Sequence, residues 1–563
     1  MKQSPLVKLV LVPAVLGLLV GLSNYLLLTG TEKLFSLTVK LTGYALEFPV
    51  EEYKDALRAF KEPIVYPLLL VLSALAVGLI KYAFIGREGV LEGTGNFVIK
   101  SFHEGKGFTV KGELARALSA VLTVGAGGTA GLFAPAASVG SAWGAALAKK
   151  AGERRVLVAS GFGAGIASMF GAPLAGALIA AEAFYKFDFE VGVLVPASVA
   201  SVVAYVVSSE LTGYGFTYHL AVEELALSAE TLLHFLFFGL LTGLFVRLYA
   251  SLLERTGSFF RRLPLPTFLV PPLGALLAAL VVLLNPLSFG RGELLLEPLA
   301  EGQVRSLLLL ALTPVTVALA SALLLTAGNG GGIFAPASFA GAFLGAFYAE
   351  LFKLDVPTFV LLGMTASFGA GAKMPVSSLI VVAEMTGGYE MLVPAAATVG
   401  TAMLASGRKS FFPAQVERRF ESPAHREEFE LYALKAIKVK EFMSAPVYAV
   451  SPDETLREVW VKLLKLGVSG FPVVENGKLV GVVTKEDLLK HLHELERKTV
   501  AEVMTEEPTV VSGEETLYKA LRLMTERGVG RLPVLDEEGN LVGIVTVTDL
   551  GRAVKRFFDE RAP

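Results

Sequence analysis

The sequence predicts an all-α polytopic membrane domain with broken helices, followed by a smaller soluble α/β domain of two tandem modules. Three observations support this prediction. First, 53% of the 563 residues are hydrophobic, which is too many for a chain of soluble domains. Second, 45 of the 102 charged residues (50 basic and 52 acidic) lie in the last 143 positions, so charge is concentrated in the C-terminal quarter. Third, each of these two regions contains an internal repeat.

Long apolar segments recur from the N-terminus to residue 405. The first predicts a membrane helix rather than a cleaved signal peptide, because it is long and other apolar segments follow it. Gly and Pro interrupt several segments, and interrupted helices at membrane depth are tolerated where they line a cavity. The predicted segments are 6–28, 64–85, 114–148, 155–184, 191–208, 230–253, 267–284, 305–326, 333–352, 357–384 and 391–405.

The membrane region is a tandem duplication. GLFAPA at 131–136 returns as GIFAPA at 332–337, 201 positions later, and Glu182 and Glu384 follow these motifs at matching places. Interrupted helices in corresponding positions of two halves favour an inverted repeat with a binding site near the midplane. We predict a membrane domain at 1–412 with halves at about 1–208 and 230–412, a linker at 413–435, and soluble modules at 436–497 and 498–563.

The Gly-rich turns of the repeat predict an anion site. Glycine lets the backbone approach a ligand closely, and a helix is expected to begin at or near the Pro that follows. The first turn of a helix has unpaired N–H groups and roughly +0.5 of an elementary charge, so it attracts an anion without an inserted cation, which would cost at least ~2.5 kcal/mol. A third Gly-rich turn adds a threonine hydroxyl. The predicted anion-binding residues are Thr94, Gly95, Leu132, Phe133, Ala134, Ile333, Phe334 and Ala335.

The C-terminal region holds a second repeat. SPDETLREV at 451–459 matches SGEETLYKA at 512–520, and LVGVVTKEDLLK at 479–490 matches LVGIVTVTDLGR at 541–552. Each unit has the pattern of an amphipathic helix, a short apolar strand, a turn, and a second strand that enters a helix. The pattern predicts a pair of α/β modules.

Several motifs resemble those of the CLC family of chloride channels and chloride/proton exchangers. GTGNF at 93–97, GLFAP at 131–135 and GIFAP at 332–336 occupy the places of the family's GSGIP, GREGP and GxFxP motifs. SFFPAQ at 410–415 is similar to the segment with the family's pore tyrosine, and the tail looks like the paired CBS modules of many CLC proteins. The resemblance implies the inverted-repeat CLC fold, chloride as the transported ion, and a homodimer with one pore per subunit.

The chain departs from the family pattern at its gating and proton-transfer residues. The gating glutamate falls on Phe133, the proton-transfer glutamate on Ala183 and the pore tyrosine on Phe412, while the pore serine becomes Thr94. Because proton exchange needs a titratable relay, we expect uncoupled, channel-like chloride conduction. Phe412 joins the anion-binding set, and Phe133 and Phe412 are candidate gates that narrow or dewet the pore. Glu182 is adjacent to Ala183, but on a helix its side chain points about 100° away from that position. We therefore expect Glu182 to have a structural role.

The CBS resemblance also implies an adenine nucleotide site for ATP, ADP or AMP. In that family the Thr at a strand end binds phosphate and the Asp three residues later binds ribose hydroxyls. The matching residues here are Thr484 with Asp487 and Thr546 with Asp549. The same pairs open predicted helices, so N-terminal capping alone also explains them. Both interpretations stay open at this point.

Composition argues against several other classes of protein. The chain has no Cys, and its six His, among them His219, show no ligand spacing, which argues against a metal site. A net charge of −2 gives no electrostatic case for a nucleic-acid partner. No pair of nucleophile and base indicates an enzyme. Two alternatives stay open: a chloride/proton antiporter that uses other residues, and a CBS-regulated cation transporter, which would need carboxylates within the membrane.

Basic residues at the ends of the membrane region predict its orientation. Arg408 and Lys409 follow the last apolar segment directly, and Lys2 lies near the start of the chain. Since cytoplasmic loops carry an excess of Lys and Arg, we expect both termini and the CBS modules in the cytoplasm of a cell of the prokaryotic type. The sparse charge of the membrane region further predicts an anion path that avoids buried charge.

Overall fold

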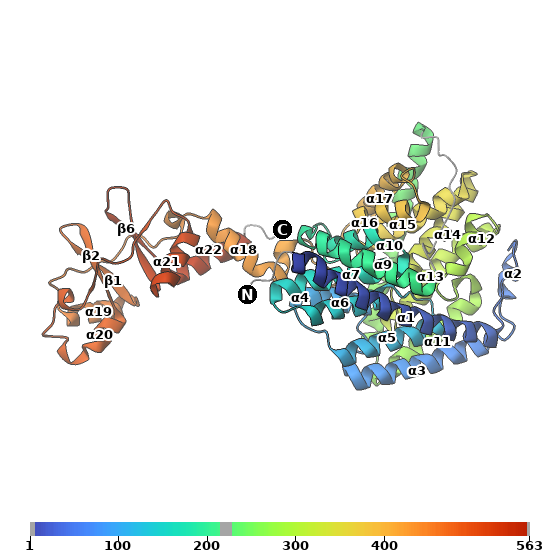
Figure 1. Cartoon of the computed structure of the whole chain (residues 1–563), viewed down its shortest axis with the longest axis horizontal. Coiled ribbons are helices and arrows are strands. Elements are labelled where there is room, and N and C mark those ends of the chain that lie inside the picture. Colours follow the sequence, from blue (N-terminus) through green and yellow to red (C-terminus); the bar gives the residue numbers. More distant parts are fainter. Residues whose placement is uncertain (1–5, 214–227, 560–563) are drawn as a thin grey trace. The chain divides into compact units, whose positions relative to one another are not determined.

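The computed structural model describes residues 6–213 and 228–559, so Lys2 and His219 lie outside the described residues. It divides into two compact units, Met1–Ala424 and His425–Pro563, and the division falls within the linker predicted at 413–435. The first unit is built from helices, and the second combines helices with short strands (Figure 1).

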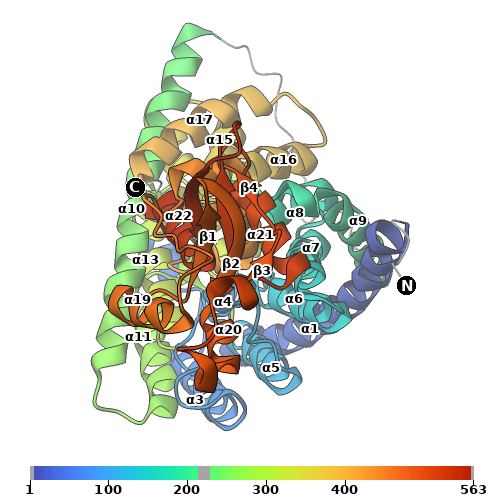
Figure 2. The ribbon, with the colours of Figure 1, turned by 90° about the vertical axis from the view of Figure 1, so that its left-hand side faces the viewer.

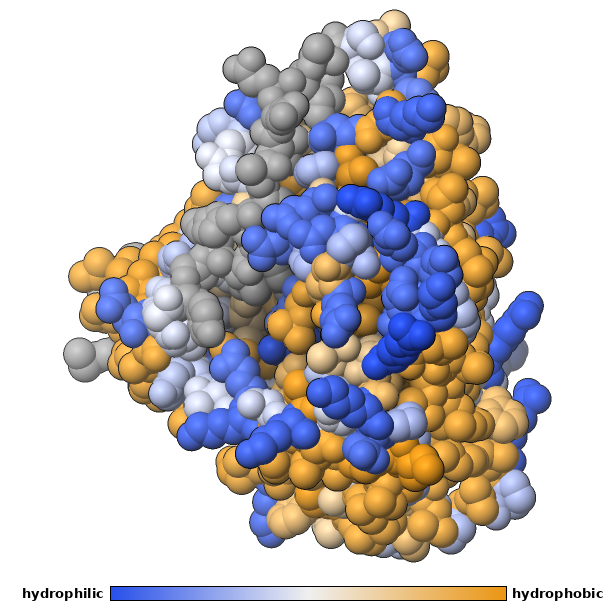
Figure 3. Space-filling model, turned by 90° about the vertical axis from the view of Figure 1, so that its right-hand side faces the viewer, coloured by the Kyte–Doolittle hydropathy of each residue, from blue (hydrophilic) through white to orange (hydrophobic). Residues whose placement is uncertain are grey.

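The first unit is the membrane-spanning part of an integral membrane protein. Among the described residues, seven helices are long and apolar enough to cross a membrane by length and composition. Apolar side chains dominate the flanks of the unit in Figure 3, and hydrophilic ones gather over the face turned toward the viewer. The helices of the first half are α1 (Val12–Thr42), α2 (Tyr53–Leu57), α3 (Val65–Ile85), α4 (Thr94–Glu104), α5 (Val110–Gly125), α6 (Phe133–Leu147), α7 (Ala151–Phe170), α8 (Pro173–Glu182) and α9 (Leu194–Thr212). Those of the second half are α10 (Ala229–Arg262), α11 (Val270–Leu284), α12 (Leu296–Ala300), α13 (Leu307–Thr326), α14 (Phe334–Phe352), α15 (Val356–Ala372), α16 (Pro375–Thr386) and α17 (Leu392–Ser406).

Three of the predicted apolar segments each hold two helices. Segment 357–384 contains nearly all of α15 and most of α16. Segment 155–184 contains α7 and α8, because Gly171 takes a left-handed φ of 70° that ends α7 and Pro173 occupies the first turn of α8. Segment 114–148 likewise contains most of α5 and then α6. The first helix, in contrast, runs to Thr42, well beyond the predicted end at residue 28. Threonine hydroxyls in this extension donate to carbonyls of the preceding turn, which satisfies them inside the helix.

The two halves meet at their duplicated motifs in a reciprocal contact. Gly131 N donates to Gly332 O over 2.9 Å, and Gly332 N donates to Gly131 O over 2.8 Å. A Cβ on Gly131 would lie 2.6 Å from the Cβ of Ala335, and a Cβ on Gly332 would lie 2.6 Å from that of Ala134. Neither position therefore has room for a side chain. A contact in which each half repeats the other's role is what a twofold axis between the halves produces.

The helix packing of the first half returns in the second. α6 packs on α7 as α14 packs on α15, and α7 packs on α9 as α15 packs on α17. Figure 2 shows α6, α7, α8 and α9 together on one side of the unit. Gly140 and Gly161 would each place a Cβ 2.0 Å from the other's carbonyl oxygen, and Gly341 and Gly363 would do the same at 2.1 and 2.0 Å. These repeated close contacts agree with the predicted duplication.

The second unit contains two similar α/β modules, as the tail repeat predicts. Each has a three-stranded sheet, in the order β1-β2-β3 or β4-β5-β6, with β1 and β2 antiparallel in one and β5 and β6 antiparallel in the other. Each module also has its own apolar core. The elements are α18 (Arg426–Ala436), α19 (Leu456–Leu466), β1 (Gly470–Glu475), β2 (Lys478–Thr484), α20 (Lys485–Lys490), β3 (Thr505–Glu506), β4 (Val511–Ser512), α21 (Leu517–Arg527), β5 (Arg531–Leu535), β6 (Leu541–Thr546) and α22 (Val547–Asp559).

Candidate functional site

Three helices of the first unit begin at the Gly-rich turns. α4 begins after Gly93, α6 after Leu132 and α14 after Ile333. No side chain forms an N-terminal cap on any of these three helices, all of which lie in the described part of the chain. Their first-turn N–H groups therefore present partial positive charge and hydrogen-bonding capacity, which suit an anion.

A cavity of about 1050 Å³ opens on the starts of all three helices. Its wall includes residues from both halves of the duplication and from the segment after α17. Of the predicted anion-binding residues, the cavity brings together Thr94, Gly95, Ala134, Ile333 and Phe412. The other four, Leu132, Phe133, Phe334 and Ala335, are not part of its wall. The helix starts thus converge on one space, although not every predicted side chain faces it.

Phe412 forms one side of this cavity. Its side chain is 4% exposed, and its ring centroid lies 5.2 Å from that of Phe334. A Cβ on Gly95 would lie only 2.7 Å from Phe412 Cε1, so the ring packs directly against the start of α4. Phe412 N donates to the Ser410 hydroxyl over 3.0 Å, which holds the backbone there. Phe412 is therefore fixed beside the starts of α4 and α14.

A chain of phenylalanine rings joins the two candidate gates. Phe133 stacks on Phe170 with ring centroids 3.9 Å apart and planes 4° from parallel. Phe170 contacts Phe368 at 6.3 Å, and Phe334 lies 5.2 Å from both Phe368 and Phe412. All five rings are buried. The position at which the resemblance places an ionisable gate is therefore held in an aromatic cluster.

Glu182 and Glu384 cap helices of opposite halves. Glu182, at the end of α8, accepts hydrogen bonds from Val376 N at 3.0 Å, from Ser377 N at 2.8 Å and from the Ser377 hydroxyl, at the start of α16. Glu384, on α16, accepts hydrogen bonds of 2.9 and 2.8 Å from the N–H groups of residues 174–175, at the start of α8. Carboxylates stabilise helix N-termini in this way. Both glutamates thus make the structural contacts that the repeat predicts for them.

The segment after Phe412 is tied to the position that matches the proton-transfer glutamate. Gln415 Nε2 donates to Ala183 O and to Ala372 O, over 2.8 Å in each case, and Gln415 Oε1 accepts from the Ser410 hydroxyl. Ala183 is fully buried, and its backbone carbonyl makes the contact. This position therefore holds the segment after α17 in place through its backbone carbonyl and presents no titratable group.

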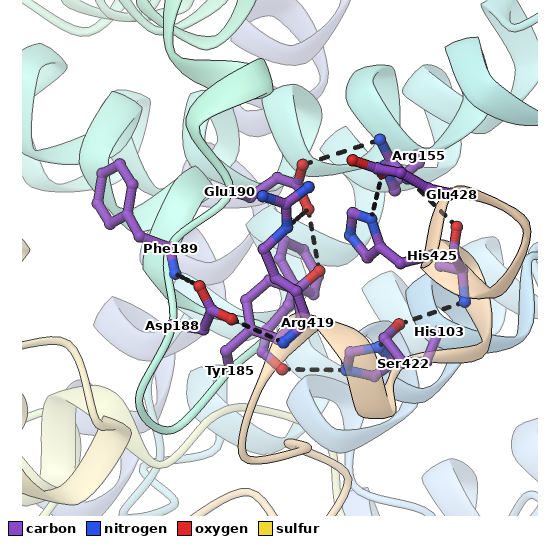
Figure 4. Close-up of polar contacts among 12 residues, drawn as sticks. His103, Arg155, Tyr185, Asp188, Phe189, Glu190, Arg419, Ser422, His425 and Glu428 are labelled. Atoms are coloured by element: carbon purple, nitrogen blue, oxygen red, sulfur yellow. Dashed lines mark hydrogen bonds and ion pairs between the residues drawn. The ribbon is translucent and has the colours of Figure 1, made fainter. Parts of the chain in front are cut away.

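A buried carboxylate anchors the chain further along this segment. Glu190 is 1% exposed and accepts a hydrogen bond of 3.0 Å from the Tyr185 hydroxyl. Its carboxylate oxygens lie 3.9 Å from Arg155 and 3.6 Å from Arg419 (Figure 4). Arg419 N also donates to Asp188 Oδ2 over 2.8 Å. These contacts fasten the segment that leads out of the first unit, and sequence reasoning missed them because they join distant positions.

The first unit contains buried cations that the sequence analysis did not anticipate. Lys81, Arg116 and Lys373 are 3%, 5% and 1% exposed. Arg116 pairs with Glu113 at 2.6 Å and lies 3.3 Å above the ring of Phe97, whereas both lysines donate to backbone carbonyls. The expectation of an anion path that avoids buried charge is wrong for this cavity, because the buried Arg116 is part of its wall. Irregular turns within the unit leave backbone carbonyl groups without a helical donor, and a buried lysine can donate to them. A lysine within an apolar run of the sequence was the signal that could have predicted such a contact.

In the second unit, the Thr of each Thr-x-x-Asp pair donates hydrogen bonds to the Asp of the same pair. The N–H and hydroxyl of Thr484 donate to Asp487 Oδ2 over 3.0 and 2.6 Å. The corresponding bonds from Thr546 to Asp549 Oδ2 measure 2.8 and 2.7 Å. Each pair therefore caps the start of a helix, α20 or α22, as the capping interpretation predicts.

Arg531 lies next to one Thr-x-x-Asp pair and contacts the module that carries the other. It lies opposite Thr546 in the register of β5 and β6, and it donates to the hydroxyl of Ser469 in the other module. Ser469 directly precedes β1, whose first residue lies opposite Thr484. Burial lowers the pKa of the Arg531 guanidinium, which nevertheless stays charged at neutral pH. Sequence reasoning missed Arg531, because only the folded chain brings it to the other module.

Two family models match the chain. Residues 72–407 match the model described as voltage gated chloride channel. Residues 439–494 and 500–556 each match the CBS domain. The matched ranges include the starts of α4, α6 and α14 and both Thr-x-x-Asp pairs.

Individual relatives and a solved structure agree with these matches. The chain is 26% identical to chloride channel protein CLC-f of Arabidopsis thaliana over 78% of its own length and 56% of that protein. It is 29% identical to the voltage-gated ClC-type chloride channel ClcB of Salmonella typhimurium over 51% of its own length and 70% of that protein. It spans about half the length of the first curated relatives that it matches. A slow cyanobacterial Cl⁻/H⁺ antiporter superposes with a TM-score of 0.61 at 21% identity, over 72% of this chain and 95% of that one. This likeness confirms the predicted fold class.

Proposed function

Because the chain belongs to the voltage-gated chloride channel family and carries two CBS domains, we propose that it conducts chloride without coupling it to protons. The ion passes through the cavity on which α4, α6 and α14 begin, and the first-turn N–H groups of these helices hold it. The observation that carries this proposal is the convergence of three uncapped helix starts, from both halves of the duplication, on one cavity.

The residues at the family's proton positions support the uncoupled mode. Phe133 and Ala183 have no ionisable group and take no part in a proton relay. Glu182 is adjacent, but three donors at the start of α16 occupy its two oxygens. A cation transporter would need carboxylates that face the ion, and the cavity wall does include Glu88, Glu92 and Glu254. The same wall also holds the basic residues Lys100, Arg116 and Arg261. The three helix N-termini that begin at the cavity therefore favour the anion.

Reconstituted protein is expected to release chloride from loaded liposomes without moving protons in the opposite direction. A potassium ionophore supplies the counter-ion, and chloride and pH electrodes read the same vesicle suspension. Protein-free liposomes serve as the control. Proton uptake in a fixed ratio to chloride release would contradict the uncoupled mode and support the antiporter alternative. Glu113→Gln and Glu190→Gln would then identify the carrier, because both carboxylates are buried.

The proposal includes a cytoplasmic second unit and a homodimeric assembly in the cell membrane. Arg408 and Lys409, directly after α17, support a cytoplasmic end for that helix. Apolar side chains on α8 and α16 are exposed, among them Leu174 at 59% and Val376 at 46%. This surface supports burial against a second copy or against lipid.

We also propose that the second unit binds an adenine nucleotide between its two modules. Arg531 lies between the strand ends that carry the Thr-x-x-Asp pairs, where its guanidinium would neutralise a phosphate. The hydroxyl of Thr484 or Thr546 would turn from its Asp partner to the phosphate. The freed carboxylate of Asp487 or Asp549 would then accept hydrogen bonds from the ribose.

Calorimetric titration of ATP, ADP and AMP into the full-length protein tests this second site. We expect binding heat with the wild type and binding at least ~10-fold weaker with Arg531→Ala, since a charge-assisted bond contributes about 1.5–3 kcal/mol. Arg527→Ala, at an exposed position on α21, is the matched control and should bind like the wild type. Absence of heat at millimolar nucleotide would show that the Thr-x-x-Asp pairs serve as helix caps only.

A further inference from the structure

Lys81 is a buried cation within a membrane-spanning helix. It lies on α3 and is 3% exposed, among otherwise apolar neighbours in the sequence. A cation at membrane depth costs at least ~2.5 kcal/mol, so such residues are retained where they have a partner or a function. Lys81 lies outside the Gly-rich motifs that carry the family resemblance.

The ammonium group of Lys81 joins the two loops that lead to α4 and α14. Lys81 Nζ donates to Val90 O over 2.6 Å and to Glu92 O over 3.3 Å, in the loop before α4. It also donates to Gly328 O over 3.0 Å, in the loop before α14. The loops touch one another as well, since a Cβ on Gly328 would lie 2.4 Å from Val90 O. One side chain thus links a loop of each half of the duplication.

Among the described residues, no carboxylate is in direct contact with the ammonium group of Lys81. Its three N–H donors go to backbone carbonyls, and within the described residues no carboxylate oxygen lies within 4.0 Å of its Nζ. Arg116, the other buried cation near the cavity, is instead paired with Glu113 at 2.6 Å. The carboxylate of Glu92 also acts on this ammonium, from beyond contact distance. Because charges interact strongly across protein that excludes water, an ammonium without a carboxylate in direct contact raises the potential of the space beside it.

We propose that Lys81 sets the chloride affinity of the cavity through its positive charge, acting on the anion from behind the loops that it ties together. Glu92 and Gly93 of one loop, and Gly331 and Gly332 of the other, line the cavity. The lysine is a positioning residue with an electrostatic effect, since it is not part of the cavity wall. The inference rests on the proposed anion path, but it holds for coupled and uncoupled transport alike.

Chloride titration of full-length variants in detergent tests the charge. Sodium chloride is titrated into protein in tartrate buffer, and the binding heat is measured. Lys81→Gln keeps hydrogen-bond donors but removes the charge, so we expect chloride affinity to fall roughly 10-fold. Lys81→Arg keeps the charge and should bind at least ~5-fold more tightly than the Gln variant. Lys111→Gln removes an exposed cation and should match the wild type.

The outcomes separate this inference from the proposed function. Wild-type chloride affinity in Lys81→Gln would overturn the role of the charge. An equal loss of affinity in the Gln and Arg variants would also overturn it, because the Arg variant keeps the charge and the loss would then come from the altered hydrogen bonds. Absence of chloride binding to the wild type would instead remove the anion site itself. If Lys81→Gln does not fold, Lys81→Arg alone is the test. A loss of chloride affinity of more than ~10-fold in Lys81→Arg would contradict the proposal, because this variant keeps the positive charge.

Discussion

Glu182→Gln is expected to destabilise the membrane unit by about 3 kcal/mol, because one buried donor loses its acceptor and the remaining hydrogen bonds lose the charge that strengthens them. The Glu182 carboxylate accepts from two backbone N–H groups and a hydroxyl at the start of α16. A glutamine amide would turn its own N–H₂ group toward one of these donors. The buried donor would then have no acceptor, and the helix N-terminus would lose its negative partner.

Thermal unfolding of the purified protein in detergent measures this effect. Glu384→Gln is a matched variant, because Glu384 caps α8 as Glu182 caps α16. Both variants should lower Tm, whereas Glu104→Gln, at an exposed position on α4, should not. Chloride release per folded molecule should persist in Glu182→Gln. A variant with wild-type Tm and altered proton movement would contradict the cap and identify Glu182 as a proton carrier.

The sequence predicts features that repeat or that act locally. The duplicated GLFAPA and GIFAPA motifs identified Gly131 and Gly332 as corresponding positions. Their direct contact is a finding of the structure. Gly and Pro within apolar runs predicted broken helices, and segment 114–148 is broken between the end of α5 at Gly125 and the start of α6 at Phe133. The break before Pro173 was not predicted, because residues 155–184 form one apolar segment in the sequence. The matching positions of Glu182 and Glu384 predicted a structural role, although not that each would cap the other half.

Features that depend on the folded chain could not be predicted in the same way. Lys81 contacts Gly328 across 247 positions, and no periodicity or local motif encodes that pair. Arg531 reaches Ser469 only because the two modules pack together. The stacking of Phe133 on Phe170 also needs the geometry of a helix start against a helix end. Composition shows that charge is sparse in the membrane region, but it could not show that Lys81, Arg116 and Lys373 are buried, or that both lysines donate to backbone carbonyls.

Phe133→Ala is expected to raise the chloride rate by at least ~10-fold, because the ring occupies the first position of α6, whose N–H groups are proposed to hold the ion. Its parallel stack on Phe170, at 3.9 Å, fixes the ring beside this helix start, where its apolar surface disfavours a hydrated anion. Since a buried Phe→Ala change costs about 3–5 kcal/mol of stability wherever it occurs, the rate must be compared per folded molecule.

Phe162→Ala is the matched control, because Phe162 is also buried, at 1% exposure. Its ring packs against Phe184, which is not one of the rings that join Phe133 to Phe412. Chloride release from liposomes should rise in Phe133→Ala and not in Phe162→Ala. If Phe170 acts by holding Phe133, then Phe170→Ala should change the rate in the wild type but not in the Phe133→Ala background. A folded Phe133→Ala protein with an unchanged chloride rate would show that this ring packs in the core without gating, and Phe412, which forms part of the cavity wall, would then be the gate to test.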